Sequence, residues 1–125
     1  MRILLDSHAL LWWANEPEKL VPTARLAIAD PANEIFASAA SVWELGLKAA
    51  KHKLRLPRDF ESFLLGNGIA LLPFTVRHAM ESTLLPSIHG DPFDRALLAQ
   101  CRVESMTFAT RDRILSQYGV QILTV

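Results

Sequence analysis

The sequence predicts an α/β fold in which one parallel β-sheet is covered by helices on both faces. Short apolar segments alternate along the chain with stretches that carry a helical spacing of apolar residues, the pattern of β-α-β units. The first segment, residues 2–5, is a short apolar run that suits a central strand buried on both faces. The chain has 125 residues, 50% of them hydrophobic, enough for a substantial core. We therefore expect residues 1–125 to form a single domain.

Five short apolar segments are expected to be strands, because each is bounded by residues that interrupt regular structure. Asp6 ends the first segment, Pro73 ends the third, and Gly119 precedes the last. The expected strands are residues 2–5, 34–38, 69–72, 106–109 and 120–125.

The segments between these strands carry the signals of helices. Pro22 opens the second helix, and Leu26 is expected on its apolar face. The helix after Asp91 has the clearest start, because Asp91 suits the N-cap and Pro92 the first helical position. Its apolar spacing makes Cys101 a buried structural thiol rather than a nucleophile. The expected helices are residues 7–15, 22–29, 40–51, 57–65, 75–84, a helix that starts at residues 91–92 and includes residue 101, and 110–118.

Four carboxylates stand at turning points between these elements. Asp6 follows the first strand, and Asp112 comes soon after the fourth. Glu44 lies on the helix entered from the second strand, and Asp94 lies in the first turn of a later helix. Parallel sheets bind ligands at the carboxyl ends of their strands, so the four acids are expected to converge there. Clustered acids repel one another unless cations or protons neutralise them, and oxygen ligands suit Mg²⁺ or Mn²⁺.

Several of these polar residues also have an ordinary structural explanation. Asp91 is interpreted first as an N-cap, and Asp94 also favours the positive end of its helix. Ser7 and Thr110 are expected to cap helices, and at a metal site their hydroxyls could orient an acid or a water.

The histidines and tryptophans are interpreted as supporting residues. No His pair or Cys cluster suggests zinc, so His8 and His89 are expected near the acids or on the surface rather than as metal ligands. The three tryptophans could stack on bases, but they stand beside leucine and valine at helical positions, which favours the core or an interface. They are Trp12, Trp13 and Trp43.

The charge distribution matters more than the total. Thirteen basic and thirteen acidic residues give no net charge, which argues against binding nucleic acid by overall electrostatics. Lys48 stands one helical turn after Glu44 and is expected to face the same cleft. One basic run is equally well explained as a solvated helix end or as a phosphate-contacting rim. It comprises Lys48, Lys51, Lys53, Arg55 and Arg58.

The motifs together resemble those of a known family. The segments that carry the resemblance are Asp6-Ser7-His8-Ala9-Leu10-Leu11-Trp12-Trp13, Ser41-Val42-Trp43-Glu44, His89-Gly90-Asp91-Pro92-Phe93-Asp94-Arg95 and Thr110-Arg111-Asp112. In order and spacing they are similar to the motifs of PIN-domain ribonucleases, specifically the VapC toxins of bacterial toxin-antitoxin pairs. The first motif usually reads Asp-Thr-His in this subgroup, and Ser7 keeps the hydroxyl.

The resemblance implies a single PIN domain with a five-stranded parallel sheet and a Mg²⁺- or Mn²⁺-dependent endoribonuclease site. Asp6, Glu44 and Asp94 match the catalytic, metal-binding acids of the family, and Asp112 matches the fourth. The family also implies an RNA substrate, a cognate antitoxin protein and a homodimer.

Two other protein classes were weighed against this interpretation. A receiver domain would need paired acids after the first strand and a lysine near the last one, and the chain has neither. A non-catalytic PIN-fold module that binds RNA or protein would typically have lost an acid. No apolar stretch is long enough to span a membrane, and Asp6 interrupts the N-terminal apolar run, so a cytoplasmic protein is expected.

Overall fold

The structure, a computed structural model, describes all 125 residues and contains one five-stranded parallel sheet. The strands are β1 (Arg2–Leu5), β2 (Glu34–Ser38), β3 (Ala70–Leu72), β4 (Thr107–Thr110) and β5 (Ile122–Thr124). Their order across the sheet is β3-β2-β1-β4-β5, and every neighbouring pair is parallel. The predicted α/β class and the five predicted strands are therefore confirmed.

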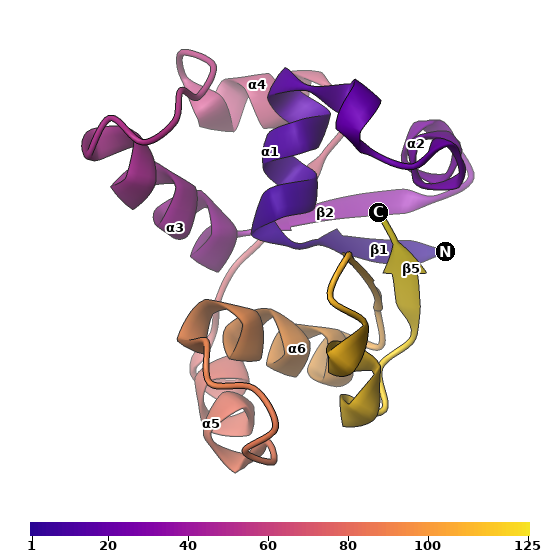
Figure 1. Cartoon of the computed structure of the whole chain (residues 1–125), viewed down its shortest axis with the longest axis vertical. Coiled ribbons are helices and arrows are strands. Elements are labelled where there is room, and N and C mark those ends of the chain that lie inside the picture. The colour runs from indigo at the N-terminus through magenta and orange to yellow at the C-terminus, as the bar shows by residue number, and fades with distance from the viewer.

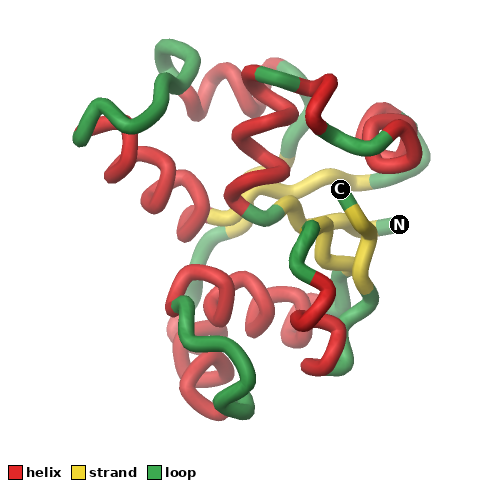
Figure 2. The backbone as a smooth tube through the Cα atoms, viewed as in Figure 1, coloured by secondary structure: helices red, strands yellow, loops and turns green.

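Helices cover both faces of this sheet. The α-helices are α1 (Ser7–Asn15), α2 (Pro22–Ala29), α3 (Ala39–Ala50), α4 (Phe60–Gly66), α5 (Val76–Leu84) and α6 (Pro92–Glu104), and the 3₁₀ helices are η1 (Pro17–Lys19) and η2 (Arg113–Tyr118). Figure 1 shows α1, α2 and α4 on one side of the sheet and α5 and α6 on the other. Figure 2 shows the loops at residues 51–59 and 85–91 projecting from the helices.

The core lies on the two faces of β1 and β4. Ile3 and Leu5 belong to one buried cluster, which α1, α2, α3 and α4 cover, whereas Leu4 and Phe108 belong to the other, under α6 and η2. These four side chains are fully buried. Neighbouring residues of β1 thus point to opposite faces, which explains why the strand reads as a continuous apolar run.

Two helix starts differ from the predicted ones by more than one residue. The helix expected from residue 57 begins at Phe60, because Asp59 takes a left-handed conformation (φ 49°) and accepts a hydrogen bond from the Ser62 amide. The last helix is a 3₁₀ helix, and its cap is Asp112 rather than Thr110. Asp112 Oδ1 accepts from the Ile114 amide at 3.2 Å, while the Thr110 hydroxyl accepts from the Asp112 amide at 3.2 Å.

Three apolar predictions have different outcomes. Cys101 is buried as predicted, and burial raises the pKa of its thiol, which keeps it unreactive. Leu26 does not lie on the buried face of α2, because Ala24 and Ile28 fill that place and leave Leu26 72% exposed. Trp43 was predicted in the core or at an interface; it is 64% exposed, so the core alternative is wrong and the interface alternative stays a prediction.

A buried histidine joins the two helices of the second layer. The His78 side chain accepts a hydrogen bond from the Thr75 amide through Nδ1, which leaves Nε2 to donate to Glu104 at 3.0 Å. No motif or spacing in the sequence indicated His78. This contact fixes the start of α5 to the end of α6 and so holds the helix that carries Asp94.

No helix of the chain combines the length and the apolar character that crossing a membrane requires.

Candidate metal-dependent active site

Asp6 lies at the junction of the two central strands. Strands β1 and β4 pair with Leu5 opposite Ala109, and the Asp6 amide donates to the Ala109 carbonyl at 3.0 Å. The Asp6 carboxylate caps α1 by accepting from the Ala9 amide at 2.7 Å. Only 6% of Asp6 is exposed, so the turn from β1 into α1 holds a carboxylate in a largely buried place.

Glu44 comes to the same place on α3. This helix starts directly after β2, where the Ser38 hydroxyl caps it by accepting from the Ala40 amide. Glu44 Oε1 accepts from the Ser7 hydroxyl at 2.5 Å, and Oε2 lies 3.2 Å from Lys48 Nζ. The predicted contact between Lys48 and Glu44 is therefore present, and Ser7 links Glu44 to the start of α1.

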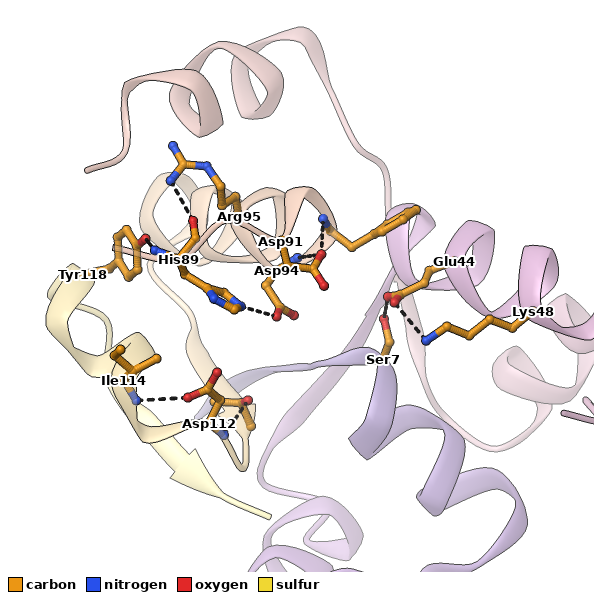
Figure 3. A network of polar contacts seen from close by, with 12 residues as sticks. Ser7, Glu44, Lys48, His89, Asp91, Asp94, Arg95, Asp112, Ile114 and Tyr118 are labelled. Atoms are coloured by element: carbon orange, nitrogen blue, oxygen red, sulfur yellow. Dashed lines mark hydrogen bonds and ion pairs between the residues drawn. The ribbon is translucent and has the colours of Figure 1, made fainter. Parts of the chain in front are cut away.

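Asp94 enters from the opposite helix layer, in the first turn of α6. Asp91 is the N-cap, and its carboxylate accepts from the Phe93 amide at 2.8 Å and from the Asp94 amide at 3.3 Å. His89 Nε2 lies 2.8 Å from Asp94 Oδ2. Figure 3 shows these contacts, with Asp94 between His89 and Glu44. The N-cap role preferred for Asp91 is thus present in the structure.

All four predicted acids line one polar pocket of about 410 Å³, although they come from four separate segments. The predicted neighbours Ser7, Lys48, Asp91 and Thr110 line it as well, together with His8, Trp12 and Arg111. Lys51, Lys53 and Arg55 are exposed and lie outside this pocket. A larger pocket, about 520 Å³, is lined mainly by apolar residues between α3, α5 and α6 and contains no carboxylate.

The sequence pattern did not indicate the part that Arg111 and Trp12 take in the pocket. The Arg111 guanidinium lies 4.3 Å from the Trp12 ring centre and donates to the carbonyls of Lys19 and Val125. Arg111 thereby ties the wall of the pocket to both η1 and the C-terminus. The position of Arg111 in the sequence could have indicated this role, because its two neighbours, Thr110 and Asp112, were already candidate site residues.

The pocket disfavours negative charge on two of its acids. Burial raises the pKa of Asp6, and hydrogen bonds from the Ala9 amide and Thr110 oppose this effect only in part. Burial also raises the pKa of Asp94, against the lowering effect of His89. The negative charge of Asp94 raises the pKa of Asp6 further, and the charges of Asp91 and Glu44 raise the pKa of Asp94. These effects reflect repulsion between the acids of the pocket.

These residues fit a hard divalent cation by the chemistry of their donors. The pocket offers carboxylate oxygens from Asp6, Glu44, Asp94 and Asp112, and no sulfur ligand lines it. In the present conformation no three acidic, histidine or cysteine side chains are gathered into a preformed metal cage. The fit to a cation therefore rests on the chemistry of the carboxylate donors and not on a preformed cage.

Comparisons with known proteins agree with this architecture. The family model of the PIN domain matches residues 3–121. The chain is 33% identical over 119 residues to Ribonuclease VapC22 of Mycobacterium tuberculosis, covering 93% of this chain and 91% of that protein. Its fold is similar to VapBC2 from Rickettsia felis bound to a promoter DNA fragment (TM-score 0.72, 14% identity, 98% of both chains). It is also similar to FitAcB from Neisseria gonorrhoeae (TM-score 0.65, 24% identity, 98% of this chain and 96% of that one). The chain therefore belongs to the PIN-domain family and, within it, to the VapC-like proteins.

Proposed function

We propose that this protein is a Mg²⁺- or Mn²⁺-dependent endoribonuclease and the toxin of a toxin-antitoxin pair. The observation that carries the proposal is the meeting of Asp6, Glu44, Asp94 and Asp112 in one pocket, although they are up to 106 positions apart in the chain. The similarity to Ribonuclease VapC22 along nearly the whole chain supports RNA as the substrate.

The four acids would hold the cation, and the neighbouring residues would hold the acids. When bound, the ion would neutralise the carboxylates, favour ionisation of the attacking water and stabilise charge that develops on the phosphate. Ser7 orients Glu44, and the Thr110 hydroxyl accepts from the Asp112 amide, so each supports an acid of the site. Hydrolysis would add water across the P–O3′ bond and leave a 3′-hydroxyl and a 5′-phosphate.

Lys48 has two roles open to it in this pocket. It balances the charge of Glu44 in the present conformation, and its side chain is 40% exposed. An exposed ammonium beside the acids can move to a phosphate oxygen of the substrate. Its contribution would then be to bind the RNA backbone next to the bond that is hydrolysed.

The basic segment next to Lys48 would guide RNA to the pocket. Lys51, Lys53 and Arg55 are exposed on the loop that follows α3, and the Asn15 side chain donates to the Arg55 carbonyl at 2.7 Å. This bond fixes the loop to the end of α1, the helix that starts at the site. Because the whole chain has no net charge, such a local segment would supply most of the attraction for phosphates.

We also propose a cognate antitoxin, a homodimer and a cytoplasmic location. The fold similarity to toxins solved in VapBC and FitAcB complexes supports the antitoxin partner. Exposed apolar side chains on α3 and α5 supply surface that a protein partner could cover. They include Trp43, Val76, Met80 and Leu84.

The alternative is a PIN fold that binds RNA or protein without catalysis. Retention of all four acids around one pocket favours catalysis, because a binding module gains nothing from two acids whose charged forms are disfavoured by burial.

The deciding experiment compares the purified chain with Asp94→Asn on cellular RNA, with Mg²⁺ or Mn²⁺ and with excess EDTA. We expect cleavage only by the unchanged protein and only with the ion, and we expect the new RNA ends to carry 5′-monophosphates. Sequencing of these ends after brief expression without the antitoxin would identify the target RNA. Full activity in EDTA would exclude the metal mechanism, and RNA binding without any cleavage would favour the binding module.

A further inference from the structure

The loop between α5 and α6 is held by two side chains that reach it from different elements. Arg95, on α6, donates to one backbone carbonyl in the last turn of α5, that of Ser82 at 3.0 Å, and to three in the loop: Leu85 at 2.8 Å, Pro86 at 2.8 Å and His89 at 3.2 Å. Tyr118, at the end of η2, is buried, and its hydroxyl donates to the Pro86 carbonyl at 3.0 Å. The same hydroxyl accepts from the His89 amide at 2.7 Å.

These contacts converge on His89. Its carbonyl is held by Arg95 and its amide by Tyr118, although His89 lies in a segment without regular secondary structure. A loop residue whose two backbone polar groups are both bound has little freedom to move. Its imidazole is directed at Asp94, with Nε2 2.8 Å from Oδ2, and Figure 3 shows the whole chain of contacts.

Capping of α5 explains only part of this arrangement. The carbonyls of Ser82 and Leu85 lie at the end of α5, where unpaired carbonyls need partners, and Arg95 supplies them. The bonds to His89 do not serve that end. They hold the residue of the loop whose side chain contacts the Asp94 carboxylate.

We propose that Arg95 and Tyr118 are positioning residues for Asp94 and that they act through His89. His89 holds Oδ2 of Asp94, while Oδ1 accepts no hydrogen bond from the protein and stays available for a cation. When one oxygen of Asp94 is fixed, the orientation of the other is fixed as well. A mobile loop would therefore lower the affinity of the site for the ion without changing any ligand. This inference rests on the proposed metal-dependent function.

The test measures Mn²⁺ binding to the full chain by calorimetry, without RNA, next to the melting temperature. The variants are His89→Ala, Arg95→Lys and Tyr118→Phe. Lysine keeps the charge of Arg95 but cannot bond four carbonyls at once, and phenylalanine removes only a hydroxyl. We expect Mn²⁺ affinity to fall about 10–100-fold in His89→Ala and Arg95→Lys. Tyr118→Phe should reduce it about fivefold, as expected for the loss of hydrogen bonds.

The matched control is Arg102→Lys. Arg102 also joins α6 to α5, through Glu81 at 3.3 Å, but it forms no hydrogen bond or ion pair with the loop. We expect this variant to bind Mn²⁺ like the unchanged protein. In addition, kcat of RNA cleavage should fall in Arg95→Lys and Tyr118→Phe with little change in KM, since neither residue lines the acid pocket.

A double variant separates positioning from general stabilisation. If Tyr118 acts through His89, Tyr118→Phe should cause no further loss of Mn²⁺ affinity once His89 is alanine. An additive loss, or a lower melting temperature with unchanged Mn²⁺ affinity, would overturn the inference and leave a purely structural clamp. Absence of Mn²⁺ binding by the unchanged protein would instead overturn the proposed function, and this inference with it.

Discussion

The Ser7 hydroxyl donates a hydrogen bond of 2.5 Å to Glu44 Oε1 and so joins the first turn of α1 to α3. Ser7 is 6% exposed, and the other Glu44 oxygen is held by Lys48. Glu44 lies on a different element from Asp6, and this hydroxyl links Glu44 to the residue that follows Asp6 in the chain. Placement of the acids therefore depends on a small neutral side chain as well as on the sheet.

Ser7→Ala should lower cleavage about tenfold or more, because Glu44 would lose the partner that orients it. Ser7→Thr keeps the hydroxyl and should retain most of the activity, provided that the added methyl group fits this buried place. Steady-state cleavage of one RNA substrate by both variants checks the prediction. Equal activity of Ser7→Ala and the unchanged protein would show that Lys48 alone is sufficient to orient Glu44.

Asp6→Asn and Asp94→Asn should separate function from stability. Each should reduce cleavage to below about 1%, since metal-ion stabilisation contributes several kcal/mol to the transition state. Each should also raise the melting temperature of the metal-free protein, because a neutral amide removes charge that burial and neighbouring acids disfavour. About 1 kcal/mol corresponds to about 4 °C in a domain of this size.

Calorimetry in EDTA measures the melting temperature of the metal-free variants. Asparagine can still cap α1 at position 6, so this variant isolates the charge rather than the cap. Unfolding of both variants would show that these acids support the fold and would remove them from the site.

The stability of the metal-free protein should depend on pH through the same two acids. The pKa of Asp6 and of Asp94 is raised above the ordinary value of 3.8, so the folded protein binds these protons more tightly than the unfolded chain. Their stabilising contribution is complete below about pH 3.8 and is lost as pH rises through the raised folded pKa.

The check is urea unfolding in EDTA from pH 4 to pH 8, for the unchanged protein and the double variant Asp6→Asn, Asp94→Asn. The free energy of unfolding of the variant should exceed that of the unchanged protein by an amount that grows as the pH rises and then levels off. Added Mn²⁺ should raise the free energy of unfolding of the unchanged protein, and this effect should be larger at higher pH because the ion binds deprotonated acids. Parallel curves for the two proteins would contradict the raised pKa values.

Removal of charge from the basic loop should weaken RNA binding and spare the chemistry. We expect the triple variant Lys51→Gln, Lys53→Gln, Arg55→Gln, in an Asp94→Asn background, to bind RNA more weakly. Its slope of log affinity against log salt should be flatter by up to about 2, given roughly 0.7 counterions per phosphate contact on single strands. In the active background, kcat at saturating RNA should be retained.

A control variant removes the same charge elsewhere. Arg25, Arg77 and Arg102 are exposed on α2, α5 and α6, and their glutamine variants should leave the slope unchanged. Equal effects of the two triple variants would show that total charge governs binding. No effect of the loop variant would mean that the loop is a solvated helix end and that RNA enters elsewhere.

Local signals in the sequence were sufficient to predict most of the strands and helices. Apolar runs bounded by Asp6, Pro73 and Gly119 predicted strands that the structure contains, and Asp91-Pro92 predicted the start of α6. These signals act over a few residues, through backbone geometry and capping, and so they can be read without the fold. The predicted start of α4 was wrong because it also depended on local signals, and the left-handed Asp59 has no local signature that distinguishes it from an ordinary turn.

Burial of individual side chains was less predictable. Leu26 and Trp43 carry apolar side chains at helical spacing and are nevertheless exposed, whereas His78 is polar and buried. The face that a helix buries is set by neighbours that are distant in sequence, and the partner of His78 is Glu104, on another helix. Periodicity shows that a helix has an apolar side, but packing selects which residues it covers.

The sequence alone determined the class of fold, the candidate acids and the chemistry that acids at strand ends can support, because these depend on residue type and chain order. Tertiary structure decided which groups hold those acids. Only the fold brings Tyr118, at the end of η2, to the amide of His89 in the loop before α6, and only the meeting of α1 with α3 brings Ser7 to Glu44. Such contacts join residues 29 and 37 positions apart, and a hydrogen bond over that separation exists only when the intervening chain has already folded around the sheet.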